Sequence, residues 1–77
     1  ALVNRGAAFA RQGELERALA DFDAVLEHFP GLPLARMNRG NLLAQLGQIE
    51  RARADLDFAC RAGAAPACAA LRGMRGR

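Results

Sequence analysis

The chain has 77 residues, enough for one domain, and a net charge of +3. All of its cations are arginine, and it contains no Ser, Thr, Tyr, Trp or Lys. Hydroxyl nucleophiles, Schiff-base lysines and the P-loop lysine are therefore excluded. Ala, Leu and Arg are the commonest residues and favour helices, whereas β-branched residues are scarce. The composition predicts an all-α domain.

The remaining reactive side chains are two cysteines, one histidine and eight carboxylates. His28 has no second ligand at a metal-binding spacing, which favours a structural or exposed histidine over a catalytic one. We therefore expect no enzyme activity, no metal site and no cofactor. No apolar run approaches the ~20 residues of a membrane span, so we also expect no membrane insertion.

The chain repeats itself at an offset of 34 residues, as from Asn4 to Asn38. The segment Asn4-Arg5-Gly6 recurs as Asn38-Arg39-Gly40, and Glu16-Arg17-Ala18 recurs as Glu50-Arg51-Ala52. Conservative pairs such as Phe22 with Leu56 fill the positions between. This gap-free match indicates a duplicated unit.

Each unit is predicted to contain two helices. In the first unit, an apolar stripe of period 3.6 ends at Gly13, and a second stripe runs from about residue 15 to 28. Pro33 suits the first turn of the next helix. The second unit repeats the plan and stops near Gly63. Pro66 then opens a short last helix that we expect to end near Leu71.

This pattern resembles the tetratricopeptide repeat. The positions that match its spacing are Leu2, Gly6, Phe9, Ala18, Phe22 and Pro30, then Gly40, Leu43, Ala52 and Leu56. The resemblance implies an α-α superhelix of two antiparallel helix pairs plus a short C-terminal capping helix. It also implies that Gly and Ala lie where paired helices cross closely. Arg5 and Arg39 depart from the family, which usually has Leu before the Gly.

On this resemblance, residues 1–77 form one domain. Repeat one covers residues 1–32, repeat two covers 33–66, and a partial third helix covers 67–77.

The tail resembles the end of a Sel1-like repeat, in which two cysteines separated by seven residues can link neighbouring helices. Cys60 and Cys68 have this separation. They are open to three interpretations: a disulfide, two reduced buried thiols, or half of a zinc site whose other ligands are missing. An oxidising compartment such as the periplasm would favour the disulfide, and a reducing cytoplasm the thiols.

The family resemblance places the first helix of each repeat on a concave face that binds partners. Amide side chains on that face suit a peptide backbone, and an arginine suits a carboxylate. A clamp for a terminal carboxylate is not expected, because the chain has no lysine. The partner-binding residues predicted in this way are Asn4, Ala7, Arg11, Met37, Asn38, Asn41 and Gln45.

Asp21, Asp23, Asp55 and Asp57 are predicted to lie on solvated helix faces, because residues two apart on a helix diverge by about 200°. Arg17 lies four residues before Asp21, and its counterpart Arg51 precedes Asp55 in the same way. We expect these neighbours to form surface ion pairs.

The sequence thus predicts a scaffold that binds a protein or peptide segment through the concave face. The alternative is a self-associating segment of a longer solenoid, in which apolar end faces form a homodimer. Those faces would be Leu2, Phe9 and Leu15 at one end, or Ala69, Ala70 and Leu71 at the other. The arginine-rich tail, Arg72, Arg75 and Arg77, lacks nearby aromatic groups, which argues against nucleic-acid binding.

Overall fold

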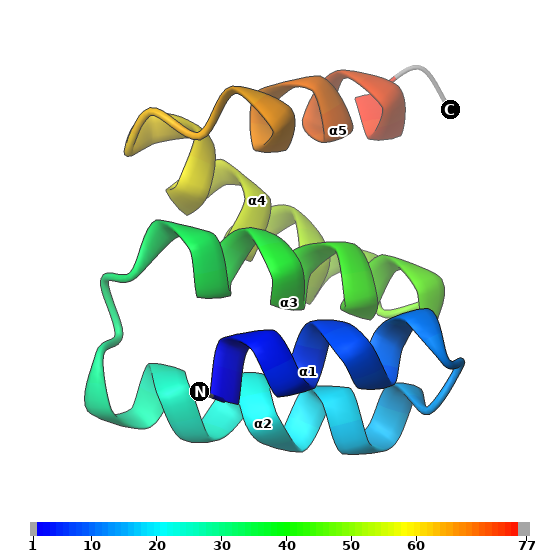
Figure 1. Cartoon of the computed structure of the whole chain (residues 1–77). Helices are drawn as coiled ribbons and strands as arrows, with labels where there is room; N and C mark the ends of the chain where they lie inside the picture. The colour runs from blue at the N-terminus through cyan, green and yellow to red at the C-terminus, as the bar shows by residue number, and fades with distance from the viewer. Residues whose placement is uncertain (1, 76–77) are drawn as a thin grey trace.

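The computed structural model describes residues 2–75 and contains five α-helices joined by short turns. The helices are α1 (Leu2–Arg11), α2 (Leu15–His28), α3 (Pro33–Gln45), α4 (Ile49–Arg61) and α5 (Ala65–Arg75). No strand occurs among the described residues, and the all-α prediction is confirmed. Figure 1 shows two antiparallel pairs, α1 with α2 and α3 with α4, stacked beneath α5. The helices α1, α3 and α5 run in the same direction, as in a helical repeat.

The turns that end α1, α3 and α4 each place a glycine in the left-handed region. Gly13, Gly47 and Gly63 have φ values of 83°, 84° and 102°, which residues with a Cβ rarely adopt. After Gly13, the backbone N–H of Glu14 donates to the carbonyl of Phe9 at 2.9 Å. The same bond recurs in the two later turns. These glycines therefore reverse the chain within three residues.

The paired helices cross closely at glycine positions, as the resemblance implied. A Cβ built on Gly40 would lie 2.8 Å from Leu56 Cγ and 3.2 Å from the carbonyl oxygen of Ala52. At the equivalent position Gly6, it would lie 3.0 Å from the ring of Phe22. The contact at Gly40 is shorter than a real Cβ tolerates and the contact at Gly6 is tight, so glycine allows the close approach of the two helices in each pair.

Two apolar clusters form much of the core, and each joins helices of neighbouring pairs. The first is built on Ala18, Phe22 and Leu42, with partly buried residues of α1 and α2, and Leu46 of the turn after α3, packed around it. The second is built on Leu56, Ala59, Ala67 and Leu71. The first cluster joins α2 to α3, and the second joins α4 to α5.

The last helix differs from its prediction. It begins at Ala65 and continues to Arg75, beyond the predicted end at Leu71. Leu71, expected on an exposed end face, is only 6% exposed because it packs against α4. Cys60 and Cys68 form a disulfide between α4 and α5. Of the basic tail, Arg77 lies outside the described residues.

Within residues 2–75, no helix has the length and apolarity needed to span a membrane.

Candidate partner-binding groove

A shallow hollow lies between α1 and α3, and most of the predicted binding residues line it. Five of the seven predicted residues meet there: Ala7, Arg11, Asn38, Asn41 and Gln45. The hollow measures about 180 Å³, and Ala10, Phe22 and Leu42 complete its walls. The residues of α1 recur along one face of that helix, and those of α3 recur at three- and four-residue spacings, so each helix contributes a single face. Two segments distant in sequence thereby form one surface.

The chemistry of this hollow is that of a polar contact surface. Three amide side chains can each donate and accept hydrogen bonds, and Arg11 supplies a positive charge. No carboxylate lines the hollow. Arg11, Asn41 and Gln45 are exposed, whereas Phe22 at the base is 1% exposed. The arrangement can hydrogen-bond a polypeptide backbone and pair with one acidic group.

The structure does not bring the other two predicted residues to this hollow. Asn4 is exposed on α1 but does not line it. Met37 is partly buried against the cluster of Leu56, Ala59, Ala67 and Leu71, so it serves the core beneath α5. The spacing of residues in the sequence could not show which face of α3 lies beside α1 and which lies beneath α5, because other helices contact both faces.

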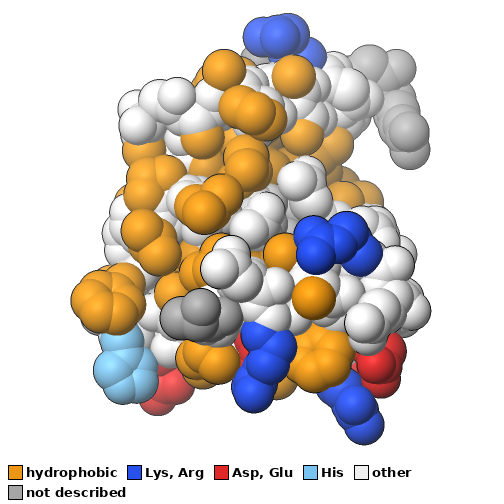
Figure 2. All heavy atoms as spheres, viewed as in Figure 1, with side chains coloured by type: hydrophobic (Ala, Val, Ile, Leu, Met, Phe, Trp, Pro, Cys, Tyr) orange, Lys and Arg blue, Asp and Glu red, His pale blue; other side chains and the backbone are white. Residues whose placement is uncertain are grey.

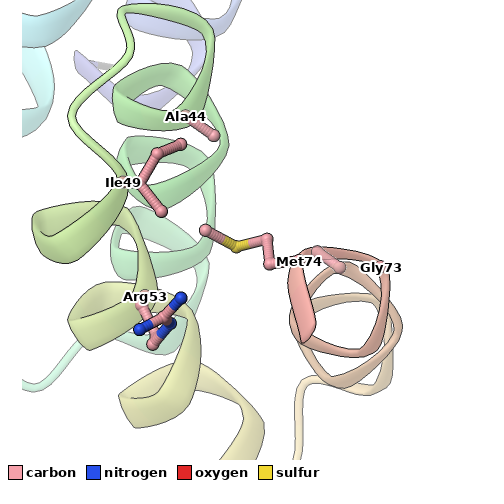
Figure 3. A pocket seen from close by; sticks show the side chains of 6 residues that line it. Ala44, Ile49, Arg53, Gly73 and Met74 are labelled. Carbon is pink, nitrogen blue, oxygen red and sulfur yellow. The ribbon is translucent and has the colours of Figure 1, made fainter. Parts of the chain in front are cut away.

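Sequence reasoning missed a second, larger hollow between α3, α4 and α5. It measures about 480 Å³ and is lined by Ala44, Ile49, Arg53, Ala70, Gly73 and Met74. Figure 3 shows Met74 reaching from α5 toward Ile49, with Arg53 on the same side as Ile49. Ile49 is 41% exposed. Arg53 is the one charged residue among those lining the hollow.

The two hollows are lined by different kinds of side chain. The hollow beside α1 is lined by amides, and the hollow beside α5 is lined by aliphatic side chains and glycine. Figure 2 shows apolar side chains gathered toward α3 and α5, and most of the basic ones toward α1 and α2.

Two of the four aspartates predicted on solvated faces, Asp21 and Asp55, are buried instead, whereas Asp23 is exposed as predicted. Asp21 is 6% exposed and Asp55 is 3% exposed. Asp21 accepts two hydrogen bonds from Arg5, at 2.8 Å from Nε and 2.7 Å from Nη2. Arg17, the predicted partner of Asp21, pairs with Glu14 at 3.4 Å. The prediction failed because helix pairing brings Arg5, sixteen residues earlier, over the aspartate.

The second repeat contains the same pair with additional contacts. Asp55 accepts from Arg39 Nε at 2.7 Å and Nη2 at 3.0 Å, and from Arg36 Nη1 at 3.2 Å. Arg39 also donates to Asp23 of α2 at 2.9 Å, so it joins the two repeats. Arg51, the predicted partner of Asp55, instead donates to Gln48 at 3.0 Å. These contacts hold α3 in place between α2 and α4.

The ion pairs shift the proton affinities of their members in the direction expected for paired charges. Hydrogen bonds from Arg5 lower the pKa of the Asp21 carboxyl below its ordinary value. The same bonds raise the pKa of Arg5. Hydrogen bonds to Asp55, and then to Asp23, raise the pKa of Arg39. The departures from the family pattern at Arg5 and Arg39 thus have a structural reason, since each arginine pairs with an aspartate sixteen residues later.

The other reactive groups do not form a site. His28 contacts the carbonyl oxygen of Ala24 at 3.2 Å through Nδ1 and is exposed at the end of α2. Across the described part of the chain, no group of three or more His, Cys, Asp or Glu side chains could hold a metal ion.

Residues 1–32 match the family model of the tetratricopeptide repeat. This match covers α1, α2 and the turn that follows. No curated protein and no solved structure matches the chain significantly. The first helix pair is thus similar to the tetratricopeptide repeat, and the second pair is related to the first by the 34-residue offset. The Sel1-like resemblance of the tail stays a prediction.

Proposed function

We propose that the chain is a protein-interaction scaffold that binds a peptide or protein segment in the groove between α1 and α3. The observation that carries the proposal is the hollow in which Arg11, Asn38, Asn41 and Gln45 converge. These side chains come from two helices that occupy equivalent positions in the two repeats. The tetratricopeptide repeat is a protein-interaction module, which supports the same conclusion.

The groove is suited to binding because its walls are already fixed. Arg5 ties α1 to Asp21 of α2, and Arg39 ties α3 to Asp55 of α4 and Asp23 of α2. A partner would therefore not have to order the backbone, which lowers the entropic cost of association. The exposed amides stand on helices, which position side chains more accurately than loops do.

The proposal is tested by selecting ligands from a displayed library of random peptides with the whole chain as bait. A selected peptide is then measured against the double variant Asn41→Ala/Gln45→Ala. We expect an affinity loss of about tenfold or more, because a bound backbone loses two hydrogen-bonding side chains. The far-UV circular dichroism should be unchanged, since both side chains are exposed.

A matched control is Gln12→Ala, which removes an exposed amide at the end of α1, outside the hollow. Its affinity should equal that of the parent chain. Peptides that bind the double variant as tightly as the parent would refute the groove as the binding site.

A further inference from the structure

The helices α3 and α5 occupy equivalent places, because each follows the second helix of a pair. They correspond at an offset of 32 residues, as from Pro33 to Ala65 at their first residues. Ala35 and Ala67 are related by the same offset, and both are 0% exposed. The junction of α2 with α3 and the junction of α4 with α5 are therefore counterparts within one molecule.

The junction of α2 with α3 is held by two arginines of α3. Arg39 donates to the carboxylate of Asp23 on α2 at 2.9 Å. Arg36 donates to the carbonyl oxygen of Pro30, in the turn between the two helices, at 2.9 Å. These arginines tie α3 both to the helix before it and to the turn that leads into it.

Among the described side chains, the junction of α4 with α5 has a disulfide where the first junction has arginines. At the 32-residue offset, Arg36 corresponds to Cys68, which is bonded to α4. Arg39 corresponds in the same way to Leu71. Arg72 is the one charged side chain that the structure describes on α5, and it is exposed. The polar ties that hold α3 are thus replaced by a single covalent bond.

The apolar contact beneath α5 is made largely by small side chains. Ala67 is 0% exposed, Leu71 is 6% exposed, and Met74 is partly buried against the same cluster. The first junction instead contains Phe22 and Leu42, each 1% exposed. Because the hydrophobic contribution grows with the apolar area buried, α5 is attached more weakly than α3 once the disulfide is left aside.

The disulfide joins the last turn of α4 to the start of α5. Cys60 and Cys68 are eight residues apart, and their Cα atoms are separated by 4.8 Å. Both cysteines are partly exposed, so a thiol in solution can reach the bond. The turn between the helices, residues 62–64, contains only alanine and glycine, and its side chains are too small to anchor α5.

From these observations we propose that the disulfide is a redox switch, which holds α5 against α3 and α4 and releases the helix when a dithiol reduces it. A thiolate of the dithiol attacks one sulfur and forms a mixed disulfide, while the other cysteine leaves as a thiolate and takes up a proton. The second thiol of the dithiol then displaces the remaining cysteine. Two electrons and two protons pass to Cys60 and Cys68, and the dithiol becomes a disulfide.

Release of α5 uncovers an apolar face of α3 and α4. Leu56 and Ala59 of α4 are 1% and 0% exposed in the disulfide-bonded protein, and Met37 of α3 is partly buried against the same cluster. Among the described helices, α5 contacts only α3 and α4, and Figure 1 shows it lying away from α1 and α2. The switch is therefore independent of the binding proposed for the groove. An oxidising environment keeps this face covered, and a reducing one uncovers it.

The switch is tested by limited trypsin digestion of the whole chain without denaturant, with and without dithiothreitol. Arg72 of α5 and Arg17 of α2 are both exposed arginines within helices, so trypsin cleaves after either only when the helix opens locally. Reduction should raise the cleavage rate at Arg72 by about tenfold or more and leave the rate at Arg17 unchanged. Reoxidation should restore slow cleavage at Arg72.

The matched control is Cys60→Ala/Cys68→Ala, which removes the bond and keeps two small apolar side chains. This variant should be cleaved rapidly at Arg72, at the same rate with or without dithiothreitol. Equal cleavage at Arg72 in the oxidised and reduced parent chain, or slow cleavage there in the variant, would overturn the switch, because α5 would then be held without the disulfide. Reduction that speeds cleavage at Arg17 as much as at Arg72 would also overturn it, since the whole chain would then unfold.

Discussion

Removal of the Asp55 carboxylate should destabilise the protein more than any other single change to its ion pairs. The Asp55 side chain is 4% exposed and accepts three N–H groups at 2.7, 3.0 and 3.2 Å. Its partners Arg39 and Arg36 are 18% and 25% exposed, so neither guanidinium is fully hydrated. In Asp55→Ala, both arginines lose a carboxylate that water replaces only in part.

The magnitude follows from the burial of the pair. Breaking a fully buried ion pair costs about 3–5 kcal/mol, and the arginines here retain some water, so we expect about 2–3 kcal/mol. A domain of this size has a free energy of unfolding of about 4–12 kcal/mol. The urea midpoint should therefore fall by about 2–3 M, for a denaturant dependence near 1 kcal/mol per molar.

Asp23→Ala is the matched control, because Asp23 binds the same Arg39 with its side chain 48% exposed. Such a pair contributes below about 1 kcal/mol. The free energies of unfolding of the two variants are first compared at low salt, by urea unfolding followed with far-UV circular dichroism. A concentrated-salt series should reduce the effect of Asp23→Ala and leave most of that of Asp55→Ala. If both variants lost the same free energy of unfolding, burial of the carboxylate would not set the strength of these ion pairs.

Three further predictions concern the crossing glycines, the disulfide and acid stability. Gly40→Ala should lower the free energy of unfolding by about 1–3 kcal/mol through overpacking, whereas Gly73→Ala, with open space around it, should raise it by up to about 1 kcal/mol in the same urea assay. Reducing the disulfide between Cys60 and Cys68 should cost about 2–3 kcal/mol, seen as a lower melting temperature; an unchanged melting temperature would contradict this estimate. Folding lowers the pKa of the Asp21 carboxyl, so its pair with Arg5 stabilises the folded protein above the unfolded value of 3.8. This stabilisation is lost as the pH falls below that value. The urea midpoint of Asp21→Asn should therefore vary less with acid pH than that of the parent chain. If both midpoints varied with pH to the same extent, the pair of Asp21 with Arg5 would not be the source of the acid sensitivity.

The sequence alone determined the helices and their repetition. The ends of α2 at Leu15 and His28 agree with the predicted limits, because helix periodicity and the Pro33 stop act between near neighbours. The close crossings at Gly6 and Gly40 could also be predicted, since the resemblance assigns small residues to those positions. Five of the seven predicted binding residues share one hollow for the same reason, as helical spacing fixes which residues share a face.

The tertiary structure decided which charges meet and where the surface is hollow. Local spacing paired Asp21 with Arg17, but the crossing of α1 over α2 brought Arg5 to it, and no short-range rule encodes that distance. The recurrence of both Arg5 and Asp21 at the 34-residue offset was a signal that could have suggested the pair. The hollow beside Ile49 could not be predicted, because it depends on how α5 packs against α3 and α4, which the contacts of the folded chain determine.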